Sequence, residues 1–307
     1  MNKLIVILGP TATGKTDFAV RVACNIQNAE IISADSRQVY KYMNIGTGKD
    51  LHSYSIKNKI IPYHLIDILE PTVNYSVYDF KKDFKNISQQ ISDNNNIPIL
   101  CGGTGLYIES ILLNYQISKS PPNQNLRNKF ESYSFEKLVK YLQLTFPKEY
   151  NKSYHISKRR IIRTIEICSF KKSTELMDMN INTKKQLENS LVLGINLDRP
   201  IILSKIKQRL HERIQEGMIK EVEELIAMGI SIERLKYFGL EYRYIAQYLN
   251  KELTLDKMIE KLNYAINRFS KRQMTFYRRM EKRGIKIHWI NTKSNKGMNL
   301  INKFLKR

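Results

Sequence analysis

Hydrophobic positions in the first third of the chain follow two alternating patterns. Short apolar runs typical of buried strands occur at Lys3–Leu8, Glu30–Ala34, His64–Leu69 and Ile97–Cys101. Between these runs, apolar residues recur at helical spacing, first at Phe18, Val22 and Ile26 and then along Val77–Ile91. Strands that alternate with helices in this way predict an α/β fold, a parallel sheet flanked by helices.

The pattern changes near the middle of the chain. From Pro121 to Asn189 the apolar spacing is helical and no strand is indicated. A strand at Leu191–Asn196 then returns to the core, followed by helices from Ile201 to Glu281, a strand at Ile285–Ile290 and a last helix. We therefore expect a catalytic core at 1–120, an inserted helical subdomain at 121–189, and the rest of the core with basic C-terminal helices at 190–307.

Composition excludes several classes of protein. No apolar run approaches the roughly 20 residues that span a bilayer, and the apolar start leads into a glycine-rich loop instead of a cleavage site. We expect a cytoplasmic protein with no membrane association. Cys24, Cys101 and Cys168 lack the spacing of a disulfide framework or a zinc site.

The net charge of +22 over 307 residues opposes compaction and favours a polyanionic partner such as a nucleic acid. The alternative is a host whose proteins are generally rich in Lys, Asn and Ile. The segment 267–307 is especially basic, and Glu281 is its single acid. Phe269 and Phe276 lie among these cations and could stack on bases, but helical spacing favours a core position for both.

A phosphate-binding loop follows the first strand. Gly9-Pro10-Thr11-Ala12-Thr13-Gly14-Lys15-Thr16 matches GxxxxGK[ST] between a buried strand and an amphipathic helix, which is the context that the motif requires. Consecutive backbone N–H groups and the helix N-terminus would bind phosphate oxygens. Lys15 would contact the phosphates, and the Thr16 hydroxyl would be a ligand of Mg²⁺.

The sequence around this loop differs from that of an NTPase. The strand Ile97–Cys101 is followed by Gly102-Gly103-Thr104, without the expected metal-binding carboxylate. Asp35 follows another strand, and strand carboxyl ends in an open α/β sheet face one crevice, so Asp35 is a candidate base beside a bound polyphosphate. Alternatively, Asp35 caps a turn with Ser36. The arrangement suits either phosphoryl transfer or displacement of diphosphate from an alkyl carbon.

Several longer motifs make the chain similar to one family over nearly its whole length. They are Gly9–Thr16, Ile32–Tyr40, Met43–Lys49, His64–Asp67, Tyr75–Phe80, Gly102–Tyr107 and Lys271–Arg278. On these residues the chain resembles the bacterial tRNA dimethylallyltransferases (tRNA isopentenyltransferases). The resemblance implies a fold like that of P-loop nucleotide kinases with a helical insertion.

The resemblance also implies the reaction: transfer of a dimethylallyl group from dimethylallyl diphosphate to N6 of the adenine 3′ of the anticodon, position 37, with release of diphosphate. Residues 9–16 would then bind the diphosphate with Mg²⁺, and Asp35 would accept the N6 proton. Thr104 matches a family threonine near the reacting atoms, and Arg209 matches an arginine that reaches the diphosphate. From local sequence alone, Thr104 could be a helix N-cap and Arg209 a solvated surface charge.

The target base must leave the stacked anticodon loop to reach such a site. The resemblance assigns tRNA contacts to residues of the first loop, the insertion and the C-terminal helices, and we expect the enzyme to act as a monomer. These residues are Asp35, Ser36, Arg37, Gln38, Arg159, Arg160, Arg163, Arg243, Lys271, Arg272, Gln273 and Arg278.

Two stretches depart from the family pattern. Relatives commonly have an Asn-containing turn before the paired arginines, where this chain has Tyr154–Lys158, and many have Gly-Tyr-Lys/Arg where it has Phe238-Gly-Leu-Glu-Tyr-Arg243. Alternative functions are prenyl transfer to free AMP, ADP or ATP, a P-loop small-molecule kinase, and a non-catalytic RNA-binding protein. The large basic surface argues against the first, and the intact phosphate loop argues against the last.

Overall fold

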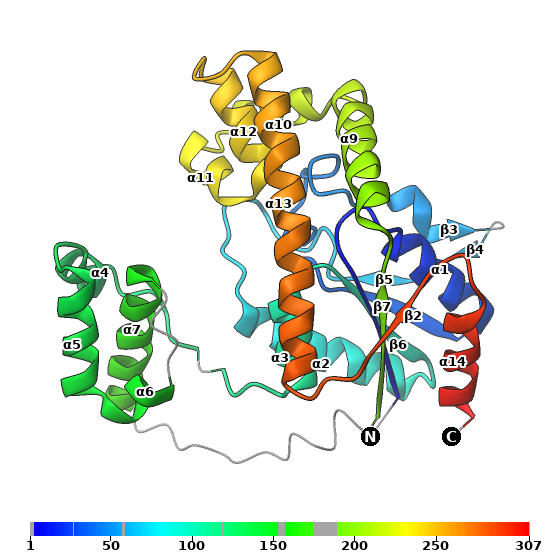
Figure 1. The fold of residues 1–307 in the computed structure, drawn as a ribbon, viewed down its shortest axis with the longest axis horizontal. Coiled ribbons are helices and arrows are strands. Elements are labelled where there is room, and N and C mark those ends of the chain that lie inside the picture. The colour runs from blue at the N-terminus through cyan, green and yellow to red at the C-terminus, as the bar shows by residue number, and fades with distance from the viewer. Residues whose placement is uncertain are drawn as a thin grey trace. The chain divides into compact units, whose positions relative to one another are not determined.

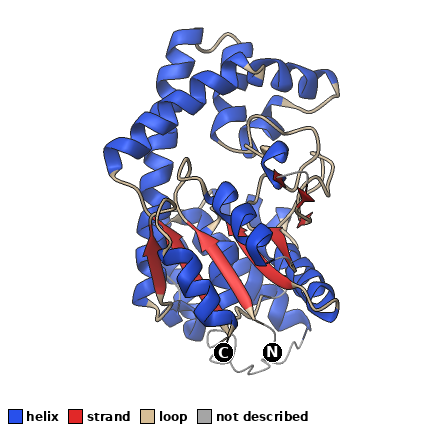
Figure 2. Ribbon diagram, turned by 90° about the vertical axis from the view of Figure 1, so that its right-hand side faces the viewer, coloured by secondary structure: helices blue, strands red, loops and turns tan. Residues whose placement is uncertain are grey.

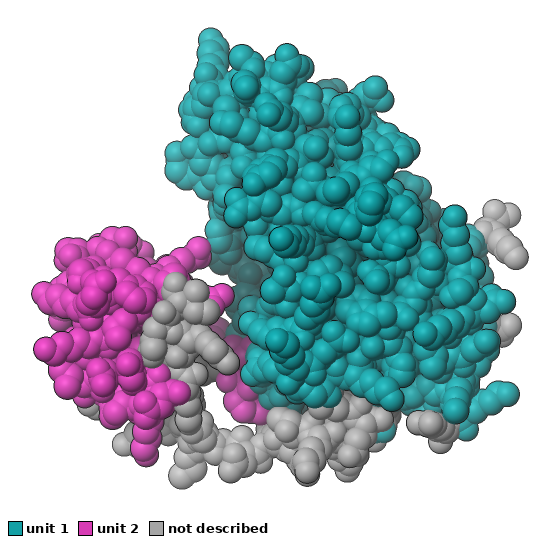
Figure 3. All heavy atoms as spheres, in the orientation of Figure 1, with its two compact units in different colours: residues 1–115, 183–307 teal, residues 116–182 magenta. Residues whose placement is uncertain are grey.

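The computed structural model describes residues 3–26, 28–56, 59–117, 119–152, 157–174 and 189–306. The chain forms two compact units, one made of residues 1–115 and 183–307 and the other of residues 116–182 (Figure 3). The second unit contains most of the stretch that we expect to be inserted. Within the described residues, no helix is both long enough and apolar enough to cross a membrane.

The larger unit is built on a parallel sheet of six strands. In the order of the sheet these are β5 (Tyr63–His64), β2 (Ala29–Ser33), β6 (Ile97–Gly102), β1 (Leu4–Leu8), β7 (Ser190–Ile195) and β8 (Ile287–Ile290). Two short antiparallel strands, β3 (Ser55–Ile56) and β4 (Lys59–Ile60), form a separate ribbon. The predicted α/β class is confirmed.

The strand predicted at His64–Leu69 is wrong beyond its first residue. Leu65 and Asp67 have φ angles of 61° and 55°, in the left-handed region, which ends the extended backbone after His64. Only Leu69 returns to sheet-like pairing, through an isolated bridge to Tyr40. An apolar run alone does not reveal such a change of backbone conformation.

Both faces of the sheet are covered, because side chains alternate along buried strands (Figures 1 and 2). Ile5 and Ile7 belong to a core with helices α1 (Lys15–Ile26) and α14 (Lys296–Leu305). Leu4, Val6 and Leu8 belong to a larger core on the other face. That core includes residues of α2 (Val77–Asp93), α3 (Gly105–Leu112), α9 (Arg199–Gln215), α10 (Met218–Ala227), α11 (Ile232–Tyr237), α12 (Leu240–Leu249) and α13 (Leu255–Lys282).

The smaller unit is helical in its described part and has its own core. Its helices are α4 (Gln124–Glu131), α5 (Phe135–Thr145), α6 (Pro147–Lys152) and α7 (Lys158–Thr174). Phe130, Leu138, Leu142 and Ile165 are fully buried between them. The family departure at residues 154–156 lies outside the described residues.

Strand register determines where the functional loops meet. Cys101 of β6 pairs with Ile7 of β1 on one side and with Ser33 of β2 on the other. The three strands therefore end level, and the chain leaves them within two residues at Gly9, Gly103 and Asp35. A short 3-10 turn at Leu51–Tyr54 lies farther along the chain that follows β2.

Candidate active site

The phosphate loop connects β1 to α1 in a tightly bonded conformation. Gly14 has a φ of 77°, which favours glycine, and the buried Thr13 hydroxyl donates to the Pro10 carbonyl at 2.8 Å. Lys15 Nζ donates to the same carbonyl, also at 2.8 Å. Burial lowers the pKa of Lys15 to about 8, with Arg209 adding to the effect. A bound anion would supply the negative charge that favours the ammonium form.

Helix α13 holds this loop against the end of β6. Gln273 Oε1 accepts from the Thr11 N–H at 2.9 Å, while Gln273 Nε2 donates to the Gly103 carbonyl at 3.0 Å. The fully buried Tyr277 hydroxyl lies 3.1 Å from the Gly9 carbonyl and 3.2 Å from that of Gly103. A Cβ at Gly103 would lie 2.6 Å from Gln273 Nε2, so this close approach requires glycine.

Asp35 lies at the cavity and also caps a turn. Its Oδ1 accepts from the Arg37 N–H at 2.9 Å, while Oδ2 has no hydrogen bond to any residue in the described ranges. The Ser36 N–H donates to Thr104 Oγ1 at 3.1 Å. Thr104 occupies the N-cap position of α3, but its side chain makes no capping bond. The turn bond therefore orients one carboxylate oxygen and leaves the other available.

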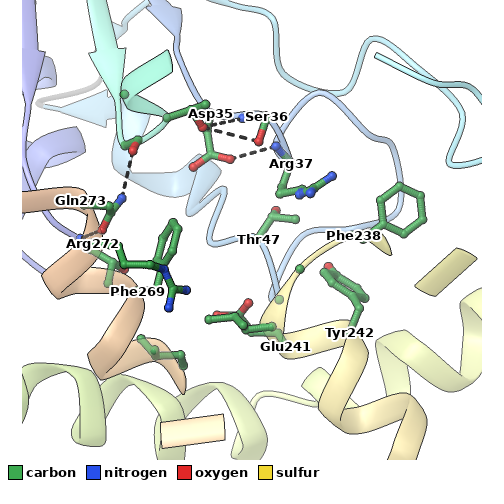
Figure 4. A pocket seen from close by; sticks show the side chains of 18 of the residues that line it. Asp35, Ser36, Arg37, Thr47, Phe238, Glu241, Tyr242, Phe269, Arg272 and Gln273 are labelled. Atoms are coloured by element: carbon green, nitrogen blue, oxygen red, sulfur yellow. Dashed lines mark hydrogen bonds between the residues drawn. The ribbon is translucent and has the colours of Figure 1, made fainter. Parts of the chain in front are cut away.

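Two cavities meet at Asp35. One, of about 370 Å³, contains residues 11–16 of the phosphate loop together with Gly102 and Gly103. The other, of about 360 Å³, is bounded by Thr104, Phe238, Tyr242 and Phe276 (Figure 4). Both are lined by Thr11, Asp35, Thr47, Gly103, Arg209, Phe269 and Gln273. Molecules bound in the two cavities would touch along this shared boundary.

Arg209 lies at the same boundary, so its interpretation as a solvated surface charge is wrong. It is half-buried, and its guanidinium donates to Thr11 Oγ1 of the phosphate loop. Burial, followed by the positive charge of Arg213, lowers the pKa of Arg209 to about 10, which still leaves it protonated at neutral pH. It is therefore a cation beside the phosphate cradle.

The loop at residues 43–50 forms another wall and is held by groups that sequence reasoning missed. Glu221 of α10 accepts from the N–H groups of Asn44, Ile45 and Gly46 at 2.6–3.0 Å, and from the Tyr242 hydroxyl at 2.7 Å. Lys49 is 1% exposed and is bonded to the Tyr40 carbonyl and to Asp67. In the sequence, Glu221 resembles any surface glutamate of a charged helix.

Three residues expected to contact tRNA have partners inside the protein. Gln273 is 7% exposed and uses both ends of its amide, as described above. Gln38 accepts from the Ser33 hydroxyl at 2.8 Å and donates to the Gly48 carbonyl at 2.9 Å. Arg163 pairs with the buried Glu166 at 3.0 Å and donates to the Ser120 carbonyl. All three support neighbouring backbone or side chains.

The other expected contacts have accessible side chains. Arg37 is half-buried, with its guanidinium 5.0 Å from the centre of the Tyr237 ring, and Ser36 lines the second cavity. The exposed members of the set are Arg159 and Arg160 on α7, Arg243 on α12, and Lys271, Arg272 and Arg278 on α13. These cations are placed where solvent or a polyanion can reach them.

The basic C-terminal segment is partly structural. Arg279 and Arg283 pair with the fully buried Glu109 of α3 at 2.7 and 3.1 Å. Phe276 is half-buried against the core, as favoured by its spacing. The core position expected for Phe269 is wrong, because its ring is 39% exposed and lines both cavities.

The phosphate loop offers few side chains that could bind a metal ion. Thr16 lines the phosphate cavity, and its hydroxyl has no hydrogen bond within the described ranges. Among these residues, no group of three or more His, Cys, Asp or Glu side chains could hold a metal. This arrangement fits Mg²⁺, which commonly uses one or two protein ligands together with phosphate oxygens and water.

Comparison with known proteins places the chain among prenyl-transfer enzymes. The sequence model described as IPP transferase matches residues 38–280, and one described as isopentenyl transferase matches residues 2–63. The tRNA dimethylallyltransferase 1 of Azobacteroides pseudotrichonymphae is 46% identical over 99% of this chain and 97% of the relative. That of Parabacteroides distasonis is 44% identical over 94% and 92%.

Solved structures agree with this placement. A tRNA Δ(2)-isopentenylpyrophosphate transferase from Staphylococcus epidermidis is 29% identical, with a TM-score of 0.68 and complete coverage of both chains. A eukaryotic dimethylallyltransferase acting on tRNA has a TM-score of 0.80 over all of this chain and 80% of its own. At 20% identity, the latter shows similarity of fold alone.

Proposed function

The chain belongs to the IPP transferase family, and on that premise we propose that it transfers a dimethylallyl group from dimethylallyl diphosphate to tRNA. The acceptor is N6 of the adenine directly 3′ of the anticodon, at position 37. Diphosphate is the leaving group. The observation that carries this proposal is the boundary between the two cavities, where Asp35 and Arg209 lie beside the phosphate loop.

The two cavities suit the two substrates differently. The cradle at residues 11–16 offers N–H groups and the Lys15 ammonium to a diphosphate. The second cavity offers aromatic and apolar walls, including Phe238, Phe269 and Phe276, to a hydrocarbon tail and a planar base. A donor that spans the boundary would place its reactive carbon near Asp35.

Asp35 supplies the proton acceptor. The amino group of adenine is a poor nucleophile because its lone pair is delocalised into the ring, so attack is assisted by a group that accepts the N6 proton. The Arg37 N–H fixes Oδ1 of this carboxylate, and Oδ2 is left to accept that proton. The new N6–carbon bond forms as the carbon–oxygen bond to diphosphate breaks.

Lys15 and Arg209 stabilise the departing diphosphate, on which negative charge accumulates. When bound, Mg²⁺ would supply further positive charge to those oxygens, and Thr16 is the residue that would hold it. Gln273 and Tyr277 contribute by fixing the loop backbone before the substrate arrives. The reaction proceeds by displacement of diphosphate and does not involve hydrolysis of ATP.

Recognition of tRNA draws on the accessible cations. The target base is extruded from the anticodon loop, at a cost of about a few kcal/mol. Ser36 would lie close to the extruded nucleotide, and the accessible cations would neutralise phosphates of the tRNA; they are Arg37, Arg159, Arg160, Arg243, Lys271, Arg272 and Arg278. The net charge of +22 supports a partner of this kind.

The test is incubation with dimethylallyl diphosphate, Mg²⁺ and an anticodon stem-loop that carries adenine at the target position. Mass spectrometry of the RNA should show one five-carbon addition at that adenine and none when guanine replaces it. Addition to free AMP, ADP or ATP in place of RNA would identify an adenylate prenyltransferase. Phosphate transfer from ATP would identify a kinase, and either result would refute the proposal.

A further inference from the structure

The second cavity contains a carboxyl group that the proposed reaction does not use. Glu241 lies in the first turn of α12, within the stretch that departs from the family's Gly-Tyr-Lys/Arg motif. Figure 4 shows its side chain across the pocket from Asp35, between Phe269 and Tyr242. It lines this cavity but not the one that contains the phosphate loop.

Within the described part of the protein, the hydrogen bond to this carboxyl group comes from its own backbone N–H. No hydrogen bond or ion pair joins its carboxylate to another described residue, although Arg209 and Arg213 of α9 act on it electrostatically. Arg37 is also nearby, because Glu241 Oε2 and Arg37 Nε lie 3.9 and 4.0 Å from the point where a Cβ at Gly239 would be. A carboxyl group in a cavity with hydrogen-bonding positions left unfilled is costly unless a ligand fills them.

The chemistry of the two substrates decides which one can be that partner. Diphosphate is negatively charged and belongs in the other cavity, and the dimethylallyl group has no polar atom. The base alone offers hydrogen-bonding groups at this depth. We propose that Glu241 is a specificity-determining residue, whose carboxyl group donates a hydrogen bond to a ring nitrogen of the adenine while Asp35 faces N6.

Electrostatics supports the neutral form. Burial raises the pKa of Glu241, and Asp35 acts in the same direction, while a hydrogen bond from its own backbone N–H, then Arg213 and Arg209, oppose them. A neutral carboxyl can donate to N1, N3 or N7 of adenine. Donation to N1, together with Asp35 at N6, would discriminate against guanine, which places an N1–H donor and an O6 acceptor where adenine has an acceptor and a donor.

This inference rests on the proposed function and is tested by a cycle of enzyme and substrate changes. Wild type, Glu241→Ala and Glu241→Gln are compared under single-turnover conditions on stem-loops with adenine, 1-deaza-, 3-deaza- or 7-deazaadenine at the target. Each deaza base lacks one ring nitrogen. We expect Glu241→Ala to lower kcat/KM on adenine about tenfold, and the Gln variant, which retains a donor, to recover most of this loss.

The decisive result is energetic coupling between Glu241 and one ring nitrogen of the target base. One deaza base should lower wild-type kcat/KM about tenfold and have almost no further effect on Glu241→Ala, whereas the same change should remain costly with Glu223→Ala, an exposed control on α10. If all three deaza bases affect wild type and Glu241→Ala equally, the role of Glu241 is refuted. The wild-type reaction on adenine tests the proposed function separately.

Loss of folding would not obscure this outcome. Removal of a carboxyl group with no hydrogen bond to another described residue should leave the melting temperature of Glu241→Ala unchanged or higher. If that variant nevertheless fails to fold, the same cycle with Glu241→Leu, which fills more of the space, gives the coupling. Equal deaza effects in wild type and the Leu variant would refute the proposal in the same way.

Discussion

Gln273 accepts a hydrogen bond from the backbone N–H of Thr11 at 2.9 Å, across 262 positions of sequence. Its other end donates to the Gly103 carbonyl, so one side chain of α13 joins the phosphate loop to the end of β6. Loop residues that we propose to contact substrate are thereby fixed by a side chain of another helix. Substitutions can separate these two kinds of residue.

Gln273→Leu should lower both stability and donor binding. The substitution leaves the Thr11 N–H without its partner and removes one of the two hydrogen bonds to the Gly103 carbonyl, which costs about 1–3 kcal/mol. Denaturant unfolding should show that loss, and KM for dimethylallyl diphosphate should rise. Thr275→Ala, at an exposed position of the same helix, is the matched control. Unchanged stability of the Leu variant would show that the link contributes nothing.

Asp35→Asn should separate binding from chemistry. The amide oxygen can still accept from the Arg37 N–H, so the turn should survive, but an amide cannot take the N6 proton. We expect turnover to fall by about 10²–10⁴ with little change in stem-loop affinity. Quantification of prenylated RNA and a filter-binding titration measure the two quantities. Near-normal turnover would remove Asp35 as the base.

Donor affinity should depend on the titration of Lys15. Its pKa in the free protein is lowered to about 8, so the ammonium is charged below that pH and loses its charge above it. Affinity for pyrophosphate should therefore fall as pH rises from 7 to 9. In Lys15→Arg the side chain remains charged, and this dependence should be much weaker. Identical profiles for both proteins would assign the dependence to another group.

Ala substitutions of neighbouring arginines on α7 should have different effects on RNA binding and on stability. Arg159 and Arg160 are exposed, so replacing both with Ala should weaken stem-loop binding and reduce its dependence on salt, with stability unchanged. Arg163 is bonded to the buried Glu166, so Arg163→Ala should destabilise the unit at 116–182 by about 1–3 kcal/mol. Binding at several salt concentrations and thermal unfolding distinguish the two effects. Equal losses of stability would contradict this division.

Local features of the sequence were sufficient for the class of fold and for the position of the loop that we propose binds phosphate. The loop at residues 9–16 is continuous in sequence, and its strand and helix are marked by apolar spacing, so each part is determined by near neighbours. Asp35 could be placed beside it because parallel strands end on the same side. The strand expected at His64–Leu69 failed because left-handed backbone at Leu65 and Asp67 is set by its surroundings.

Tertiary structure alone decided which polar residues face substrate and which support the fold. Gln273, Arg163 and Glu221 look like solvated helix positions in the sequence, yet each has a hydrogen-bond partner far along the chain. Glu241 has the same appearance but lines a cavity, with no hydrogen bond to another residue in the described ranges. A side chain's role depends on what surrounds it in space, and helical periodicity specifies only the direction in which it points.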